Sequence, residues 1–399
     1  MSSVLTTDRL LKTIKRRGFI PNSQESFTDA DFLEIATEEM NFGIIPMMIR
    51  AQEEHLVYTI DIPFELGKRN YAIPTRAHGN KVRDVSLIDT NGNIYEMFRY
   101  SIDEIPDFSK SNFRTESRGF YIQNNEIILL GEGQLSYKAL RFYIYLRPNA
   151  LVPFDNGGVS TSLTSIFETD NLNPYSQVAT NIAIGVDSII TLPTTEGLTS
   201  GDFVLITSSN STPSIDGLRS VTVLSSTQIK VEGVNVTVAG TSANVTKQLE
   251  CVSFSLAKFP KNFAIGSLYD FTQKDSPNKI IHWDVPVNTI NFNAKQISFP
   301  KSLISKVQLG DFITLAEESI VPNIPVELHP ILAQRVAIAC LESMGDEQGK
   351  QSAERKLKEM ETSVMTLIDN RVEAANVKIK NRHGVLQQAT RSRLKRYSR

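Results

Sequence analysis

The chain begins and ends with segments whose apolar residues recur at helical spacing. Near the N-terminus, the run TDADFLEIATEEMNF starts with Thr28 and Asp31 at the separation of a capping box. Near the C-terminus, ELHPILAQRVAIACLESMG and KQSAERKLKEMETSVMTLID flank a Gly-bounded break. We therefore predict helices over 28–56 and 328–368 that form one bundle. The second C-terminal helix carries its apolar seam at Ala353, Leu357, Met360, Val364 and Leu367.

Between these ends the pattern changes to strands. Residues 58–148 contain alternating segments, two of them joined across Asn91-Gly92 as in a hairpin. From about 166 to 250 the chain becomes rich in Ser and Thr, with short apolar runs separated by turn residues. This composition predicts a small all-β module, a barrel or sandwich, inserted into the host domain.

The predicted fold class is α+β, with terminal helices forming a bundle, central β-strands and the inserted β-module. The expected parts, in chain order, are N-terminal core helices at 1–57, a β-rich core part at 58–165, the module at 166–253, a second β stretch at 254–320, an αα-hairpin at 321–370 and a basic tail at 371–399.

Composition supports a globular chain with an uneven charge. The 399 residues are 41% hydrophobic and 22% charged, which suits a real core. No apolar run reaches the length of a membrane helix, and the first residues lack a secretory signal core. Two cysteines, Cys251 and Cys340, favour reduced thiols and synthesis in a cytoplasm. The net charge of −2 leaves about −10 on residues 1–377, because residues 378–399 hold eight Lys or Arg and no acidic residue.

A repeated Gly-Asp-Phe is the strongest candidate for chemistry. Asp202 and Asp311 each follow a glycine and precede an alternating apolar run, and two carboxylates could form a hydrolase site. Turn formation explains the same residues: Gly supplies a positive φ, Asp bonds the backbone two residues on, and Phe enters the core. We favour the turn. GDEQGKQS lacks the spacing of a phosphate-binding loop, and the five histidines lack metal spacing. We therefore expect no enzyme activity, no metal and no cofactor.

Two long segments resemble phage neck adaptor proteins, also called head-to-tail connector or head-completion proteins. VPNIPVELHPILAQRVAIACLESMGDEQGKQSAERKLKEME resembles their C-terminal helical region. TDADFLEIATEEMNFGIIPMMIRAQEEHLVY followed by NYAIPTRAHGNKVRDVSLID resembles their N-terminal region. The similarity covers roughly 1–150 and 255–375. The segment GLTSGDFVLITSSNSTPSIDGLRSVTVLSSTQIKVEG is similar to small β-modules of phage structural proteins, and it departs from the plainer adaptors.

The resemblance implies a non-enzymatic ring, commonly of twelve subunits, bound beneath the portal in the virion neck and assembled in the bacterial host cytoplasm. Such a ring extends the DNA channel and provides a platform for tail or nozzle proteins, with fibre proteins as possible contacts of the module. An acidic body suits a channel through which phage DNA passes without specific binding.

The basic tail is the segment we expect to dock on the portal, with DNA as the alternative partner. The residues expected at that contact are Lys378, Lys380, Arg382, Leu386, Arg391, Arg393, Leu394, Lys395, Arg396 and Arg399.

A rival hypothesis is a β-rich tail or receptor-binding protein that grips glycans. The module is poor in aromatic residues, and the chain has one tryptophan, Trp283, which disfavours that hypothesis because sugar sites usually use aromatic platforms.

Overall fold

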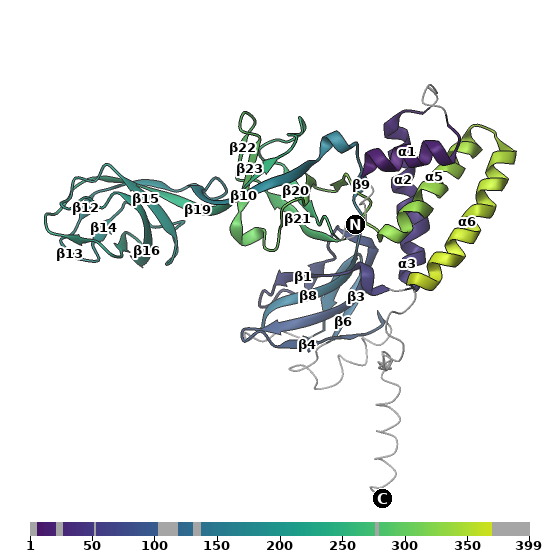
Figure 1. The fold of residues 1–399 in the computed structure, drawn as a ribbon. Helices are drawn as coiled ribbons and strands as arrows, with labels where there is room; N and C mark the ends of the chain where they lie inside the picture. The colour runs from purple at the N-terminus through teal and green to yellow at the C-terminus, as the bar shows by residue number, and fades with distance from the viewer. Residues whose placement is uncertain are drawn as a thin grey trace, which may run out of the picture. The chain divides into compact units, whose positions relative to one another are not determined.

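The computed structural model describes residues 6–20, 27–51, 53–102, 119–130, 137–275 and 279–368. It is mostly β, with 42% of residues in strands and 24% in helices, and its largest element is a sheet of 13 strands. The expected α+β fold terminated by a helical bundle is therefore wrong. The helical spacing at the chain ends does produce helices, but the short central segments join into one extended sheet that outweighs them (Figure 1).

The chain divides into two compact units. The first contains the residues up to Thr37 together with Asn149–Ala353, and the second contains Glu38–Pro148 together with the residues from Glu354 onward.

The helices of the first unit include α1 (Thr7–Arg17), α2 (Asp29–Glu38) and α5 (His329–Ser343), and α1 packs against α5. Fully buried Leu10 and Ile14 belong to α1, and a hydrogen bond of 2.6 Å from Arg17 Nη1 to Gln334 Oε1 joins the two helices. Thr28 caps α2 as predicted: its hydroxyl accepts from Asp31 N–H at 3.3 Å, while its own N–H donates to Asp31 Oδ2 at 2.6 Å.

Helix α6 (Glu347–Ile368) begins in the first unit and continues into the second. Its predicted seam is only partly covered. Ala353 is buried, whereas Leu357, Met360 and Val364 are half-buried.

The second unit holds a π-helical turn (Glu39–Ile44), α3 (Ile45–Ala51) and two four-stranded sheets. Asp89 closes the predicted Asn91-Gly92 hairpin by accepting hydrogen bonds from the N–H groups of Asn91 and Asn93 at 2.9 and 2.8 Å. The first sheet has the order β1 (Val57–Pro63), β8 (Tyr137–Leu146), β3 (Ala77–Asp89), β4 (Ile94–Glu96). The second has the order β2 (Asn70–Ala72), β7 (Glu126–Leu129), β6 (Gly119–Gln123), β5 (Phe98–Arg99).

In the first unit, one part of the large sheet encloses an aromatic core, which we call the host core. Tyr269, Phe254, Phe271 and Phe299 are fully buried there, with the Phe271 and Phe299 ring centroids 4.9 Å apart. The strands of this part are β10 (Gly158–Thr169), β19 (Ala243–Leu256), β20 (Leu268–Thr272), β21 (Ile280–Pro286), β22 (Thr289–Asn291), β23 (Gln296–Pro300) and β24 (Phe312–Leu315). Short strands β9 (Ala150–Leu151) and β25 (Glu318–Ser319) pair beside them.

The segment between β10 and β19 has a separate aliphatic core, which we call the module core. Val204, Ile206, Ile229 and Val236 are fully buried in it. Its strands are β11 (Ser176–Ala179), β12 (Asn181–Ile182), β13 (Gly185–Val186), β14 (Ile189–Thr191), β15 (Phe203–Thr207), β16 (Gly217–Ser225), β17 (Gln228–Val231) and β18 (Asn235–Val236).

Strand β19 belongs to both cores, but it uses opposite faces for them. Ala243 and Val245, at odd positions, face the module core, whereas Phe254 and Leu256, at even positions, face the host core. Side chains of a strand alternate between the two faces of its sheet. The buried face therefore changes between Val245 and Phe254, and this stretch is the junction of the two β regions.

Candidate functional site

The residues predicted for portal docking, from Lys378 to Arg399, lie outside the described residues. The two aspartates of the repeated Gly-Asp-Phe lie within the described residues.

Asp202 and Asp311 occupy the same kind of turn. Oδ2 of each accepts a hydrogen bond from the backbone N–H three residues earlier, Thr199 at 2.8 Å and Gln308 at 2.7 Å. The preceding glycines have φ of +99° and +91°, as the turn hypothesis predicts. Both carboxylates therefore act locally as turn formers.

Two details of that hypothesis are wrong. Each aspartate bonds the backbone three residues before it, and not two residues on. Phe312 is buried, but Phe203 is 38% exposed, because Val204 and Ile206 enter the module core in its place.

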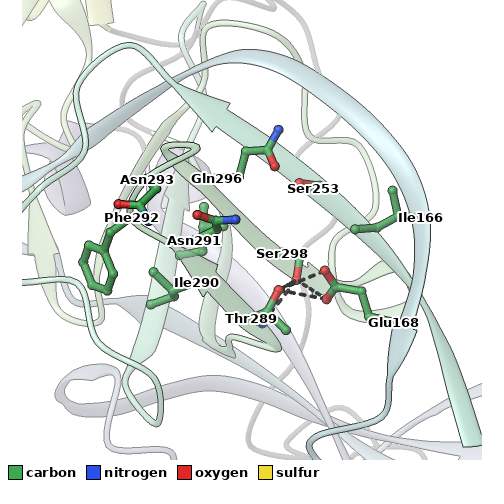
Figure 2. Close-up of a pocket in the computed structure, with 11 residues that line it drawn as sticks. Ile166, Glu168, Ser253, Thr289, Ile290, Asn291, Phe292, Asn293, Gln296 and Ser298 are labelled. Atoms are coloured by element: carbon green, nitrogen blue, oxygen red, sulfur yellow. Dashed lines mark hydrogen bonds between the residues drawn. The ribbon is translucent and has the colours of Figure 1, made fainter.

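The junction contains a carboxylate held by three side-chain donors. Glu168, at the end of β10, accepts hydrogen bonds from the hydroxyls of Ser298 and Thr289 at 2.5 and 2.9 Å (Figure 2). It also accepts one from Asn288 Nδ2 at 2.8 Å. Donors that converge on a carboxylate fix its orientation. Glu168 thereby connects β10 to the β22–β23 hairpin.

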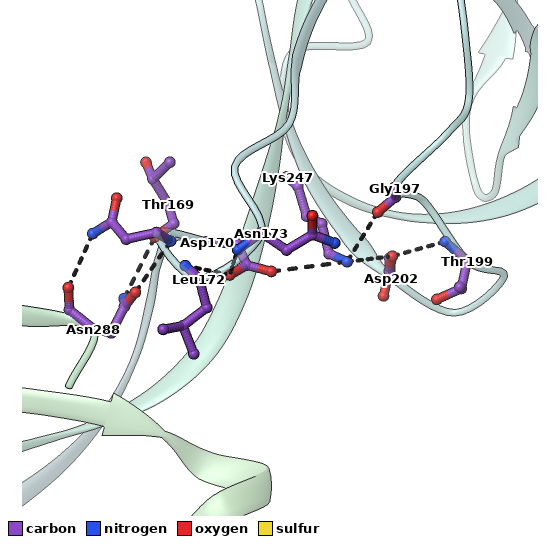
Figure 3. A network of polar contacts seen from close by, with 10 residues as sticks. Thr169, Asp170, Leu172, Asn173, Gly197, Thr199, Asp202, Lys247 and Asn288 are labelled. Carbon is purple, nitrogen blue, oxygen red and sulfur yellow. Dashed lines mark hydrogen bonds and ion pairs between the residues drawn. The ribbon is translucent and has the colours of Figure 1, made fainter. Parts of the chain in front are cut away.

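Asn288 is the central residue of this connection, and only 1% of it is exposed. Besides Glu168, its Nδ2 lies 3.3 Å from Cys251 Sγ, and its Oδ1 accepts the N–H of Asn171 at 3.2 Å. Its backbone carbonyl accepts Asn171 Nδ2 at 3.1 Å (Figure 3). One side chain therefore bridges the end of β10, the middle of β19 and the loop before β22.

A second cluster lies on the module side of the junction. Lys247 Nζ is 3.0 Å from Asp202 Oδ2 and 3.8 Å from Asp170 Oδ2, and it donates to the carbonyl of Gly197 at 3.1 Å (Figure 3). The Lys247 and Asp170 side chains are only 12% and 7% exposed. Ion pairs this well covered are screened much less by salt than surface pairs. Lys247 thus joins β19 to the turns before β11 and β15.

A pocket of about 600 Å³ opens beside Glu168 (Figure 2). Its lining holds one carboxylate and is otherwise amide, hydroxyl and apolar, without a histidine, cysteine or lysine. These amide and hydroxyl groups offer hydrogen bonds for polar recognition. The lining residues are Ile166, Glu168, Ser253, Thr289, Ile290, Asn291, Phe292, Asn293, Gln296, Ile297 and Ser298.

Other reactive groups of the described residues are buried in structural positions. Burial raises the pKa of Cys251 to about 12 and that of Cys340 to about 11, so both thiols are poor nucleophiles at neutral pH. Burial lowers the pKa of His329 to about 4, and its Nε2 lies 3.1 Å from the Ile324 carbonyl oxygen. Within the described residues no three His, Cys, Asp or Glu side chains gather as metal ligands. None of the described helices is long and apolar enough to cross a membrane.

Neither a protein-family model nor a curated protein matches the chain.

The junction residues are absent from the sequence-based predictions. Glu168, Lys247 and Asn288 belong to no motif, and Glu168 and Asn288 are 120 positions apart. The nearest signal in the sequence is the change of composition near residue 166, which marks where the module begins but not what holds it.

Proposed function

We propose that this chain is a structural, non-enzymatic subunit of a phage neck, forming a ring below the portal that extends the DNA channel and carries the tail. The proposal rests on the sequence resemblance at both ends of the chain and on the acidic balance of residues 1–377. The proposal does not depend on the expected helical bundle, which the fold contradicts.

The structural observation that best supports the proposal is the junction. Strand β19 runs from the host core to the module core, and β10 pairs with it as far as Thr169. At the crossing, the side chains of Glu168 and Asn288 and the ion pairs of Lys247 join the two regions. A part that transmits load between neighbours needs such continuity, and Asp202, one of the two carboxylates that could have suggested catalysis, is engaged in it through Lys247.

The test of the ring is direct. The full chain is mixed with purified portal and imaged by negative-stain electron microscopy. Closed rings of the chain on one end of the portal are expected. A chain that stays monomeric with portal at every concentration would overturn the proposal. Hydrolysis of a cell-wall or capsular polymer that disappears in Asp202→Asn or Asp311→Asn would overturn its non-enzymatic part.

The basic tail is proposed as the portal contact. Its eight positive charges from Lys378 to Arg399 suit an acidic surface, and a ring would present many copies at once. Truncation after Val377 should weaken binding to portal and reduce the dependence of that binding on salt. Unchanged portal binding with loss of duplex DNA binding would instead identify DNA as the partner.

A second candidate function, glycan binding by a virion protein, is favoured by the pocket beside Glu168. Asn291, Asn293 and Gln296 are exposed there, and side-chain amides can both donate to and accept from sugar hydroxyls. Titration with neutral oligosaccharides, using Gln296→Ala as the comparison, tests this candidate. Binding that the substitution leaves unchanged would exclude the pocket as the sugar site.

A further inference from the structure

One face of the module sheet is covered by the module core, and the opposite face exposes apolar side chains. Phe203 and Leu205 alternate along β15 with the buried Val204 and Ile206, and they are 38% and 37% exposed. Leu218 of β16 pairs directly with Leu205 and is 38% exposed. Strand β15 is therefore apolar on both of its faces.

Neighbouring strands extend this surface, which we call the outer face. Phe167 of β10 is 42% exposed, and its ring centroid lies 5.1 Å from that of Phe203. Val178 of β11 is 54% exposed and pairs with Asn244 of β19. The register places all five on the side opposite the module core. Glu250 of β19 pairs with Phe167 at the edge of this side and forms an ion pair with Lys301. The outer face consists of Phe167, Val178, Phe203, Leu205 and Leu218, with Asn244, Thr246 and Gln248 of β19 between them.

None of these eight residues is charged, although 22% of the chain is. Contiguous apolar patches of this kind mark interaction sites on soluble proteins. A cover for the outer face must itself be apolar and free of charge, because a charged group placed against it would lose its hydration without gaining a partner.

We propose that the outer face pairs with the outer face of a second copy of this chain. A second copy meets both requirements, since it brings the same uncharged apolar surface and no like-charge repulsion. Flat sheets also pack on one another with their inner side chains interdigitated, about 10 Å apart.

The size of the outer face sets the strength of the contact. Four strands about 4.8 Å apart and about six residues long span on the order of 400 Å². Stable complexes bury about 800 Å² per partner, so this pairing is weak and depends on concentration. Dissociation constants of tens to hundreds of micromolar, roughly −6 to −5 kcal/mol, correspond to such a contact.

The pairing differs in kind from the contacts that close a ring. A face that binds its own copy relates two subunits by a twofold axis, whereas a ring closes through two different surfaces. The inference therefore stands apart from the proposed neck function, and each can fail without the other.

Cysteine cross-linking of the full chain tests the pairing. Both native cysteines are fully buried, so their thiols should not react with a maleimide in the folded chain. Leu205→Cys and Leu218→Cys place single thiols near the centre of the outer face. Val186→Cys is the control: Val186 is 76% exposed and lies on β13, which pairs only with β18. Each variant is treated with a short bismaleimide between about 1 µM and about 1 mM protein, a range that brackets the expected dissociation constants.

The yield of cross-linked dimer from both outer-face variants should rise with protein concentration. It should exceed the yield of the control at least about tenfold, because a specific contact brings the thiols together more often than random collision does. Adding Phe203→Ser to Leu205→Cys should abolish the excess, while adding Phe98→Ser, at a Phe that is more exposed and lies outside the outer face, should leave it unchanged. Dimer yields equal to the control, or no dimer at the highest concentration, would overturn the pairing. In the latter case, protection of the Leu205→Cys thiol inside assembled particles would identify a different protein as the cover.

Discussion

Replacing Asn288 with alanine should weaken the junction. The variant removes the Nδ2 donor that lies 2.8 Å from Glu168 Oε2 and the Oδ1 acceptor that holds Asn171 N–H at 3.2 Å. A hydrogen bond to a charged group contributes about 1.5–3 kcal/mol to stability and a neutral one about 0.5–1.5 kcal/mol. The weak contact to Cys251 adds little. The free energy of unfolding of the first unit should therefore fall by about 2–4 kcal/mol.

Urea denaturation followed by circular dichroism measures this change, and hydrogen exchange locates it. Amides near Asn171 and in the loop before β22 should exchange faster in the variant, while those of the module core should not. Asn293→Ala is the matched control. It removes an exposed asparagine from the turn of the same hairpin, and its effect should stay within about 0.5 kcal/mol.

The reasoning would be refuted by a loss of less than about 0.5 kcal/mol in Asn288→Ala, or by a loss equal to that of Asn293→Ala. Either result would mean that water replaces the Asn288 side chain at Glu168 without cost. A drop that reaches the module core amides equally would show that the two β regions unfold together.

Three further predictions concern single side chains. His329 has a folded pKa of about 4 against an ordinary 6.5. As pH decreases between those values, the free energy of unfolding should therefore fall by at most about 1.4 kcal/mol per pH unit. Urea titrations at several pH values should show this dependence, and His329→Gln should remove it. The Asn93 side chain lowers the pKa of Asp89, so the hairpin stability that this carboxylate supplies should be present above its unfolded pKa and lost as pH falls below it. Hydrogen exchange of the β3–β4 amides should show this pH dependence, and the dependence should be absent in Asp89→Asn. Leu357→Ala should cost about 1 kcal/mol in urea denaturation, below the 2–5 kcal/mol of a fully buried leucine, because Leu357 is half-buried; a loss above about 2 kcal/mol would contradict this.

Local features of the fold could be predicted because their causes lie within a few residues. The Thr28–Asp31 capping box and the Asn91-Gly92 hairpin are present as predicted. The positive φ of Gly201 and Gly310 is local in the same sense, since only glycine adopts it without strain.

The buried face of β15 could not be predicted in this way. Its sequence FVLIT is apolar at both odd and even positions, so alternation does not say which set enters the core. The position of Phe203 after the Gly-Asp turn predicts that it enters the core. The core uses Val204 and Ile206 instead, because the register of β15 with β16 and β19 turns those two inward.

The overall fold and the junction depend on pairings between distant residues. Strands β10 and β24 pair across about 150 positions. Long-range strand pairings of this kind assemble the large sheet. Asp170 and Asn288 read in the sequence as ordinary loop residues, and only the fold brings them to the same place.

The change of buried face along β19 explains why the junction is polar. Between Val245 and Cys251 the strand is leaving one core and has not fully entered the other, so apolar side chains there would have only partial cover. The chain places Lys247 and Glu250 in this interval, and each finds a partner of opposite charge: Asp202 for Lys247 and Lys301 for Glu250. A polar crossing also fixes the register, since a slip of one residue along β19 would bury these charges in a core and expose the apolar residues that belong there. The same groups that join the two β regions thus determine which face of the strand each region buries.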